Sequence, residues 1–182
     1  MKTLQVLLTC LTLPLVSRPA SGGSWCYDSQ DPKCGPAHWK DIAKGCSGDA
    51  QSPIDIDRTK VRRDGALGPL LFQDYDTAPP GKWRLMNNGH TVMLSLEGAL
   101  GTPQIAGPGL SDPYRALQLH FHWGSATGDG SEHTVDGRRH AMEMHVVHVN
   151  ARYRNLEEAK GQRDGLAVLG FLFRVRTGAT LG

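Results

Sequence analysis

The sequence lacks the features that mark several large classes of protein. It has no internal repeats, no low-complexity tracts and no heptads, which excludes solenoids and coiled coils. Its net charge is only +2 over 182 residues, whereas a nucleic-acid-binding protein usually carries a stronger basic excess on one face. Beyond the N-terminal segment no apolar stretch approaches the roughly 20 residues of a membrane-spanning helix. We therefore expect neither a nucleic-acid partner nor a membrane span.

The N-terminus has the pattern of a secretory signal peptide. Lys2 supplies a positive charge, residues 4–16 are apolar, and the small residues at 20–22 suit a cleavage site. An N-terminal core helix is the alternative interpretation. We expect residues 1–22 to be removed and residues 23–182 to form one domain, which implies a secreted or extracellular protein.

The few cysteines fit an oxidising compartment. Cys26 and Cys34 flank turn-forming residues, so we expect a short-loop disulfide between them. Cys10 would be removed with the signal peptide, and Cys46 would then have no partner within the chain. An unpaired cysteine in a secreted chain indicates a lost partner, an intermolecular bond or a free thiol. A structural zinc site is a rival interpretation, but the Cys-x-x-Cys spacing that it usually needs is absent.

The glycines (22) and prolines (11) favour a turn-rich β fold over a helical bundle. Residues 24–60 look irregular, and strand-like runs alternate with turns from residue 70 onward. One helix is predicted, capped by Asn155, supported by Glu158 and ended by Gly161. The predicted strands lie within residues 70–72, 83–86, 91–96, 116–123, 141–150 and 166–175.

Two histidines at positions i and i+2 form the first candidate site. Side chains alternate along a strand, so His120 and His122 share one face, while Leu119 and Phe121 lie on the other. Two imidazoles on one face can bind a single cation. Alone the signal is weak, and a pair of structural histidines would be the ordinary interpretation.

A second strand strengthens the metal hypothesis. Glu143, His145 and Val147 share one face of the predicted strand that ends near residue 150. The polar, glycine-bearing loop over residues 124–140 allows antiparallel pairing with the first strand, which would place His145 beside the other two histidines. Three neutral imidazoles with an open fourth position are typical of catalytic zinc sites.

Metal-bound imidazoles also need hydrogen-bond acceptors that fix their tautomers. Gln118 lies two residues before His120, and Glu143 lies two residues before His145. Each pair shares a strand face, so we expect Gln118 and Glu143 to orient the two imidazoles.

Several motifs together resemble the α-class carbonic anhydrases. They occur in that family's order, and residues 25–39 are similar to its extracellular, membrane-anchored branch. The motifs that carry the resemblance are Gln51-Ser-Pro-Ile-Asp-Ile56, Asn87-Asn-Gly-His90, His120-Phe-His122-Trp-Gly-Ser, Ser131-Glu-His-Thr-Val-Asp136, Glu143-Met-His145 and Asp164-Gly-Leu-Ala-Val-Leu169.

The resemblance implies a mainly β (α+β) fold: a twisted, mostly antiparallel sheet with few short helices and zinc in a cleft. It implies a monomer that hydrates CO2 reversibly to bicarbonate and a proton, using hydroxide that Zn²⁺ makes available. The implied roles are Zn²⁺ ligands for His120, His122 and His145, proton shuttle for His90, hydroxyl-network orientation for Glu132, ligand orientation for Gln118 and Glu143, and an apolar CO2 wall for Val147, Leu166 and Val168. A turn histidine is the alternative for His90.

The chain also departs from the family. The resemblance covers the N-terminal two-thirds of the family's domain, so we expect a sheet that is incomplete at the C-terminus. A Thr-Thr-Pro segment, a partner for Cys46 and a lipid-attachment signal are missing, and a cell-surface anchor would require a longer product. The alternatives to an active enzyme are a catalytically impaired, association-prone fragment and a carbonic-anhydrase-related extracellular binding module.

Overall fold

The structure is a computed structural model that describes residues 25–78, 80–96, 101–125 and 129–175. The predicted signal peptide over residues 1–22 lies outside this part of the chain. Two compact units divide the protein, residues 1–45 and residues 46–182. In the described residues no helix is both long and apolar enough to cross a bilayer.

The N-terminal unit is built around the predicted disulfide. Cys26 and Cys34 are bonded, with their Cα atoms 5.2 Å apart, and the Trp39 indole N–H donates to the Cys26 carbonyl at 3.0 Å. Aromatic rings pack edge to face nearby, with centroids 5.4 Å apart for Trp25 and Trp39. Short helical turns follow the bridge: η1 Pro32–Cys34, η2 Pro36–His38 and α1 Trp39–Ile42.

The sequence prediction of a single helix was wrong here. The α1 helix spans four residues, less than two turns, and no periodic apolar pattern of that length stands out in a sequence. A further turn, η3, covers Lys44–Ser47. Cys46 lies within this turn, is exposed and carries a free thiol.

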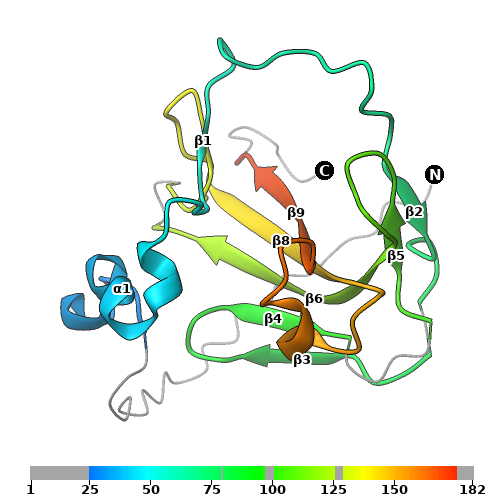
Figure 1. The fold of residues 1–182 in the computed structure, drawn as a ribbon. Coiled ribbons are helices and arrows are strands. Elements are labelled where there is room, and N and C mark those ends of the chain that lie inside the picture. The colour runs from blue at the N-terminus through cyan, green and yellow to red at the C-terminus, as the bar shows by residue number, and fades with distance from the viewer. Residues whose placement is uncertain (1–24, 79, 97–100, 126–128, 176–182) are drawn as a thin grey trace, which may run out of the picture. The chain divides into compact units, whose positions relative to one another are not determined.

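The larger unit is a curled, mostly antiparallel sheet, which confirms the expected fold class (Figure 1). Strands pair in the order β2-β5-β6-β4-β3, and β8 extends the sheet from β6 to β9. A small parallel pair, β1 with β7, lies apart from this order. The bounds are β1 Asp55–Ile56, β2 Leu71–Gln73, β3 Arg84–Asn87, β4 Val92–Ser95, β5 Gln104–Ala106, β6 Tyr114–Trp123, β7 Thr134–Val135, β8 Met142–Asn150 and β9 Leu166–Phe173.

The predicted strands all occur, whereas β1, β5 and β7 were missed. Each of the missed strands has two or three residues, too few for an alternating pattern to be recognised. The predicted helix is α2, Leu156–Ala159, and the Asn155 side chain accepts from the Glu158 N–H at 2.9 Å. It ends at Ala159 with Lys160 as its C-cap, two residues before the predicted end at Gly161.

The two long strands β6 and β8 form the centre of the sheet. They pair antiparallel over their whole length, with one irregularity between Ala116 and Gln118. The apolar core lies where β6 begins and β8 ends, at the end of the pair away from the histidines. Tyr114, Ala116 and Val149 are almost inaccessible to solvent there. This apolar packing fixes the register, because a slip of one residue would turn every side chain to the opposite face.

Candidate metal centre

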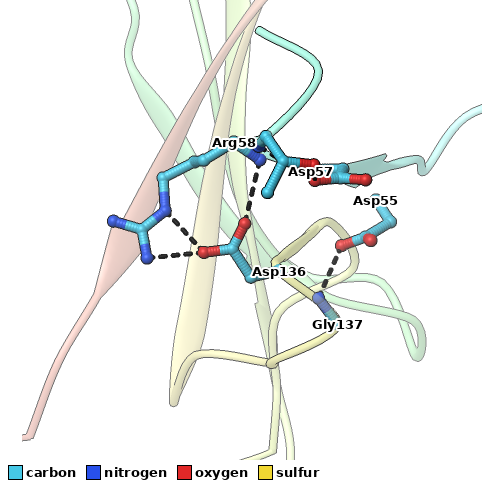
Figure 2. Close-up of a pocket in the computed structure, with 6 residues that line it drawn as sticks. Asp55, Asp57, Arg58, Asp136 and Gly137 are labelled. Carbon is cyan, nitrogen blue, oxygen red and sulfur yellow. Dashed lines mark hydrogen bonds and ion pairs between the residues drawn. The ribbon is translucent and has the colours of Figure 1, made fainter.

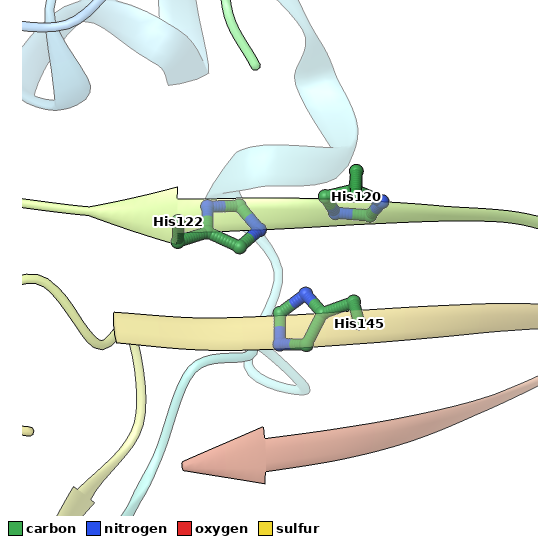
Figure 3. A group of neighbouring side chains, drawn as sticks. All are labelled: His120, His122 and His145. Atoms are coloured by element: carbon green, nitrogen blue, oxygen red, sulfur yellow. The ribbon is translucent and has the colours of Figure 1, made fainter. Parts of the chain in front are cut away.

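The register of β6 and β8 brings the three predicted histidines together. His145 lies directly opposite His120, and the next residue on the same face, His122, lies opposite Glu143. Figure 3 shows the His120 and His122 rings on β6 and the His145 ring on the neighbouring β8. The antiparallel pairing predicted from the loop length is therefore confirmed.

The three imidazoles form a compact group. Their ring centroids are 4.9 Å apart for His120 and His122, 5.3 Å for His120 and His145, and 4.7 Å for His122 and His145. One ring nitrogen from each lies within 4.8 Å of the other two. Only small shifts of the rings are needed to bring three nitrogens within about 2.0–2.1 Å of a common zinc ion.

Two of the imidazoles donate one N–H to an acceptor, which leaves their other nitrogen as a lone pair. His120 Nδ1 donates to Gln118 Oε1 at 2.9 Å, and His145 Nε2 donates to Glu143 Oε1 at 2.7 Å. The acceptors are oxygens without a proton, so the imidazole nitrogens must be the donors. The tautomers left by these bonds expose His120 Nε2 and His145 Nδ1.

His122 completes the set. Its Nδ1 lies 3.2 Å from Glu132 Oε1. Its Nε2 is buried, and no hydrogen-bond partner for it lies among the described residues. A buried nitrogen without a partner is costly, and a cation at this point would satisfy it. This is the observation by which the site fits a metal ion.

Burial favours the neutral form of His120 and His122, which is the form that binds a metal ion. Burial, followed by repulsion from His145 and His120, lowers the pKa of His122 to about 4. Burial and His145 also lower the pKa of His120. Near neutral pH both imidazoles therefore hold lone pairs ready for a cation.

Glu143 is the most heavily engaged residue of the site. Its carboxylate is almost fully buried and accepts from the Glu132 and His133 backbone N–H groups at 2.9 and 2.8 Å. The His133 Nδ1 donates to it at 2.7 Å. Burial alone would raise the pKa of Glu143, but the hydrogen bonds from His133 and His145 outweigh it and keep the pKa below its ordinary value. The charged carboxylate therefore acts as a fixed acceptor.

Sequence reasoning did not identify this contact between His133 and Glu143. The signal was present, because His133 follows Glu132 in a recognised motif, but sequence spacing does not show that its ring turns toward Glu143. His148 lies on the face of β8 opposite to that of His145. It is fully buried on the other face and hydrogen-bonds the Tyr75 hydroxyl.

Glu132 lies beside two of the three imidazoles. Its second oxygen, Oε2, is 3.8 Å from His145 Nδ1. Burial raises the pKa of Glu132 above its ordinary value. A carboxyl group at this position can accept a hydrogen bond or, when protonated, donate one at the edge of the site.

The remaining predicted residues lie on β8, on β9 and in the turn between β3 and β4. Val147 lies opposite Val168 in the β8–β9 register, and Leu166 lies two residues further along β9. All three share the face of His145. His90 is in the turn between β3 and β4. The hydroxyl of the neighbouring Thr91 donates to the Phe121 carbonyl at 2.5 Å and accepts from the Phe121 backbone N–H at 3.1 Å.

Gly170 is a further residue of the site that sequence reasoning did not identify as functional. It lies opposite His145, and a Cβ at this position would be 3.1 Å from Glu143 Oε1. That contact is tighter than a side chain normally tolerates. Glycine therefore allows β9 to lie close to the Glu143 carboxylate.

A second group of ionisable residues lines a pocket between residues 55–59 and 136–137 (Figure 2). The Arg58 guanidinium binds the Asp136 carboxylate at 2.5 Å, and the Arg58 backbone N–H donates to the same carboxylate at 2.9 Å. Asp55 accepts from the Gly137 N–H at 2.9 Å. We call this group the aspartate clasp, since its hydrogen bonds join the two segments of the β1–β7 pair.

The sequence of this chain matches a known protein family and several of its members. The family model of eukaryotic-type carbonic anhydrases matches residues 34–180. Mouse carbonic anhydrase 15 is 52% identical over 174 residues, 94% of this chain and 54% of the relative. Human carbonic anhydrase 6 is 43% identical over 142 residues, 77% of this chain and 44% of the relative.

Rat carbonic anhydrase 3 is 39% identical over 151 residues, 83% of this chain and 56% of the relative. The chain thus spans about half the length of the curated relatives that it matches. A family match over most of the chain, a curled antiparallel sheet and three facing imidazoles agree, and the chain belongs to the eukaryotic-type carbonic anhydrase family.

Proposed function

We propose that the protein is a secreted, zinc-dependent carbonic anhydrase that hydrates CO2 reversibly to bicarbonate and a proton. The observation that carries the proposal is the convergence of three imidazoles, each with one nitrogen beside an oxygen acceptor and the other nitrogen available. Membership of the family supports the same activity. The signal-peptide pattern and the disulfide support the secreted location.

His120, His122 and His145 would hold the zinc ion. When bound in such a site, zinc lowers the pKa of water to about 7 and so supplies hydroxide at neutral pH, as carbonic anhydrases in general do. Gln118 and Glu143 would keep two of the imidazoles in the tautomers that bind metal. One side-chain oxygen of each accepts a hydrogen bond from the corresponding imidazole.

The other predicted residues would bind CO2, orient the reacting hydroxyl and transfer the released proton. Val147, Leu166 and Val168 would give CO2 an apolar surface beside the histidines, since CO2 has no charge and gains little from polar groups. Glu132 would orient the hydrogen bonds of the reacting hydroxyl. His90 would carry the released proton outward, because an imidazole exchanges protons near neutral pH.

All the proposed ligands come from two adjacent strands of one chain, so the site needs no residue from a second copy. A monomer, as the resemblance implies, would therefore be sufficient for activity.

The test is zinc stoichiometry measured together with stopped-flow CO2 hydration. The chain should bind one zinc ion and hydrate CO2, and His122→Ala should abolish both. His38→Ala, which removes an exposed histidine of the N-terminal unit, is the matched control and should change neither. Zinc binding without hydration would favour the impaired fragment or the binding module, and failure to bind zinc would overturn the proposal.

A further inference from the structure

Thr91 is a buried polar residue beside the strand that carries two of the proposed zinc ligands. Its hydroxyl donates to the Phe121 carbonyl at 2.5 Å and accepts from the Phe121 backbone N–H at 3.1 Å. The same hydroxyl lies 3.2 Å from the Val92 carbonyl, so the shorter contact with Phe121 takes the hydrogen. Phe121 lies between His120 and His122 on β6. One hydroxyl thus binds both backbone polar groups of the residue between two ligands.

The backbone groups of Phe121 point toward β4, away from β8. The Leu96 N–H donates to the Leu117 carbonyl at 3.0 Å, which places the backbone groups of Leu117 on the β4 side of β6. Directions alternate along an antiparallel strand, so those of Phe121 lie on the same side. The backbone groups of His120 and His122 then point toward β8. The two edges of the ligand segment are therefore held by different parts of the chain.

The two hydrogen bonds of the Thr91 hydroxyl hold the two peptide planes that join Phe121 to the ligands. A peptide unit is planar and contains the Cα atoms of both residues that it links. The Phe121 N–H belongs to the plane shared with His120, and the Phe121 carbonyl belongs to the plane shared with His122. Binding both planes restricts the directions in which the two imidazoles leave the strand. Such restriction matters because functional side chains must be held within about 0.5 Å and 10–20° of their working geometry.

Thr91 is itself fixed by the turn that precedes β4. Its N–H donates to Asn88 Oδ1 at 2.9 Å, and its carbonyl accepts from the Asn88 N–H at 3.2 Å. Because the threonine side chain is branched at Cβ, it has few accessible χ1 rotamers. The hydroxyl is therefore presented to Phe121 from a fixed backbone and in a restricted direction.

We propose that Thr91 is a positioning residue of the metal centre, which sets the directions of His120 and His122 through the Phe121 backbone. The inference rests on the proposed function, because it requires that the imidazoles bind zinc. The β4–β6 register ends with Met93 opposite His120, and the Thr91 side chain extends the contact between these strands to the next residue of β6. The pairing with β8 holds the opposite edge of the same segment.

Thr91→Val tests the proposal, since valine keeps the shape of threonine and lacks the hydroxyl. The variant leaves the Phe121 N–H and carbonyl without this partner, so stability should fall as well. The decisive measurement is therefore the zinc affinity of the folded chain, by competition with a chelator at a temperature below the onset of unfolding. We expect the affinity to fall roughly 10-fold, as it does when other supports of metal ligands are removed. Thr91→Ser keeps the hydroxyl and should restore most of the affinity.

Two control variants separate positioning from stability. Val149→Ala removes apolar volume from the core at the far end of β8, and it should lower the melting temperature without changing zinc affinity. Thr77→Val removes an exposed hydroxyl that also donates to a backbone carbonyl, that of Asp74, and it should change neither quantity. The visible absorption of the chain loaded with Co²⁺ depends on coordination geometry. Its bands should shift in Thr91→Val and in neither control.

An unchanged zinc affinity or an unchanged Co²⁺ spectrum in Thr91→Val would overturn the inference and leave the proposed function standing. An equal loss of affinity in Val149→Ala, or no recovery in Thr91→Ser, would show that Thr91 acts through stability alone and would also overturn it. A parent chain that binds no zinc would overturn the proposed function, and this inference with it.

Discussion

The histidine group and the aspartate clasp both gather ionisable side chains between segments distant in sequence, yet they differ in what they leave available. In the clasp, Asp136 is paired with Arg58 and the Asp55 carboxylate accepts the Gly137 N–H, with the charged groups at the surface. Among the histidines, His120 and His145 each donate one N–H and keep the other nitrogen available, and the buried His122 Nε2 has no hydrogen-bond partner in the described part of the chain. Satisfied charges at a surface join segments, whereas buried lone pairs that face one another form a binding site.

The two groups also come from different supports. The histidines lie on β6 and β8, which pair over nearly their full length. The clasp lies on two strands of two residues each and an adjoining turn in which Asp136 has φ 51°. Long paired strands hold ring positions closely enough for coordination chemistry, whereas the clasp depends on its own hydrogen bonds.

Removing the acceptor beneath His145 should have the largest effect. Glu143→Gln replaces the charged acceptor by a neutral amide, so the His145 tautomer is no longer fixed. We expect zinc affinity to fall roughly 10- to 100-fold. Competition with a chromophoric chelator measures it, and Glu157→Gln on the exposed face of α2 is the control. Equal affinities for the two variants would contradict the role of Glu143.

A smaller effect is expected where β9 approaches the same carboxylate. Gly170→Ala places a Cβ about 3.1 Å from Glu143 Oε1, and we expect zinc affinity to fall up to about 10-fold as Glu143 shifts. Gly161→Ala meets no atom within 4 Å and is the matched control. If both glycine variants bind zinc like the parent, the close approach of β9 has no functional importance.

The two groups should separate in their response to acid. The folded pKa values of His120, His122 and His148 lie below the ordinary 6.5, so the unfolded chain binds more protons as the pH falls below 6.5. The free energy of unfolding of the zinc-free protein should therefore decrease as the pH falls from about 6.5 to about 4. Each histidine contributes up to about 1.4 kcal/mol per pH unit, and the raised pKa of Glu132 opposes part of the loss.

The pKa of Asp136 is lowered by its hydrogen bonds with Arg58, so its contribution is lost only below the ordinary aspartate range near 3.8. Urea unfolding with a chelator at pH 7, 6 and 5 checks both expectations. The decrease in the free energy of unfolding between pH 7 and pH 5 should be smaller in His122→Gln and unchanged in Asp136→Asn. An unchanged decrease in His122→Gln would show that this histidine does not cause the loss of stability.

The smallest effect is expected from the clasp itself. Asp136→Asn removes an exposed ion pair, and such pairs contribute little to stability in water. We expect the melting temperature to fall by no more than about 2–4 °C, with zinc affinity unchanged. Calorimetry and the chelator competition measure the two quantities. A large loss of zinc affinity would show that the clasp and the histidine site are coupled.

Much of the site could be predicted because its information is local. The i, i+2 spacing of His120 and His122 defines a shared strand face, and the same rule relates Gln118 to His120 and Glu143 to His145. Asn155 was recognisable as a helix cap for the same reason. The very short strands and α1 were missed because two to four residues carry too little pattern to recognise.

The sequence by itself determined six of the nine described strands, the faces that the histidines share, the disulfide-bonded pair and the family. Only the tertiary structure decided which nitrogen of each imidazole is available, that His133 supports Glu143, and that Gly170 leaves room for that carboxylate. The physical reason is that spacing along a strand fixes direction, whereas hydrogen-bond partners and close approaches depend on which strands lie side by side and in which register.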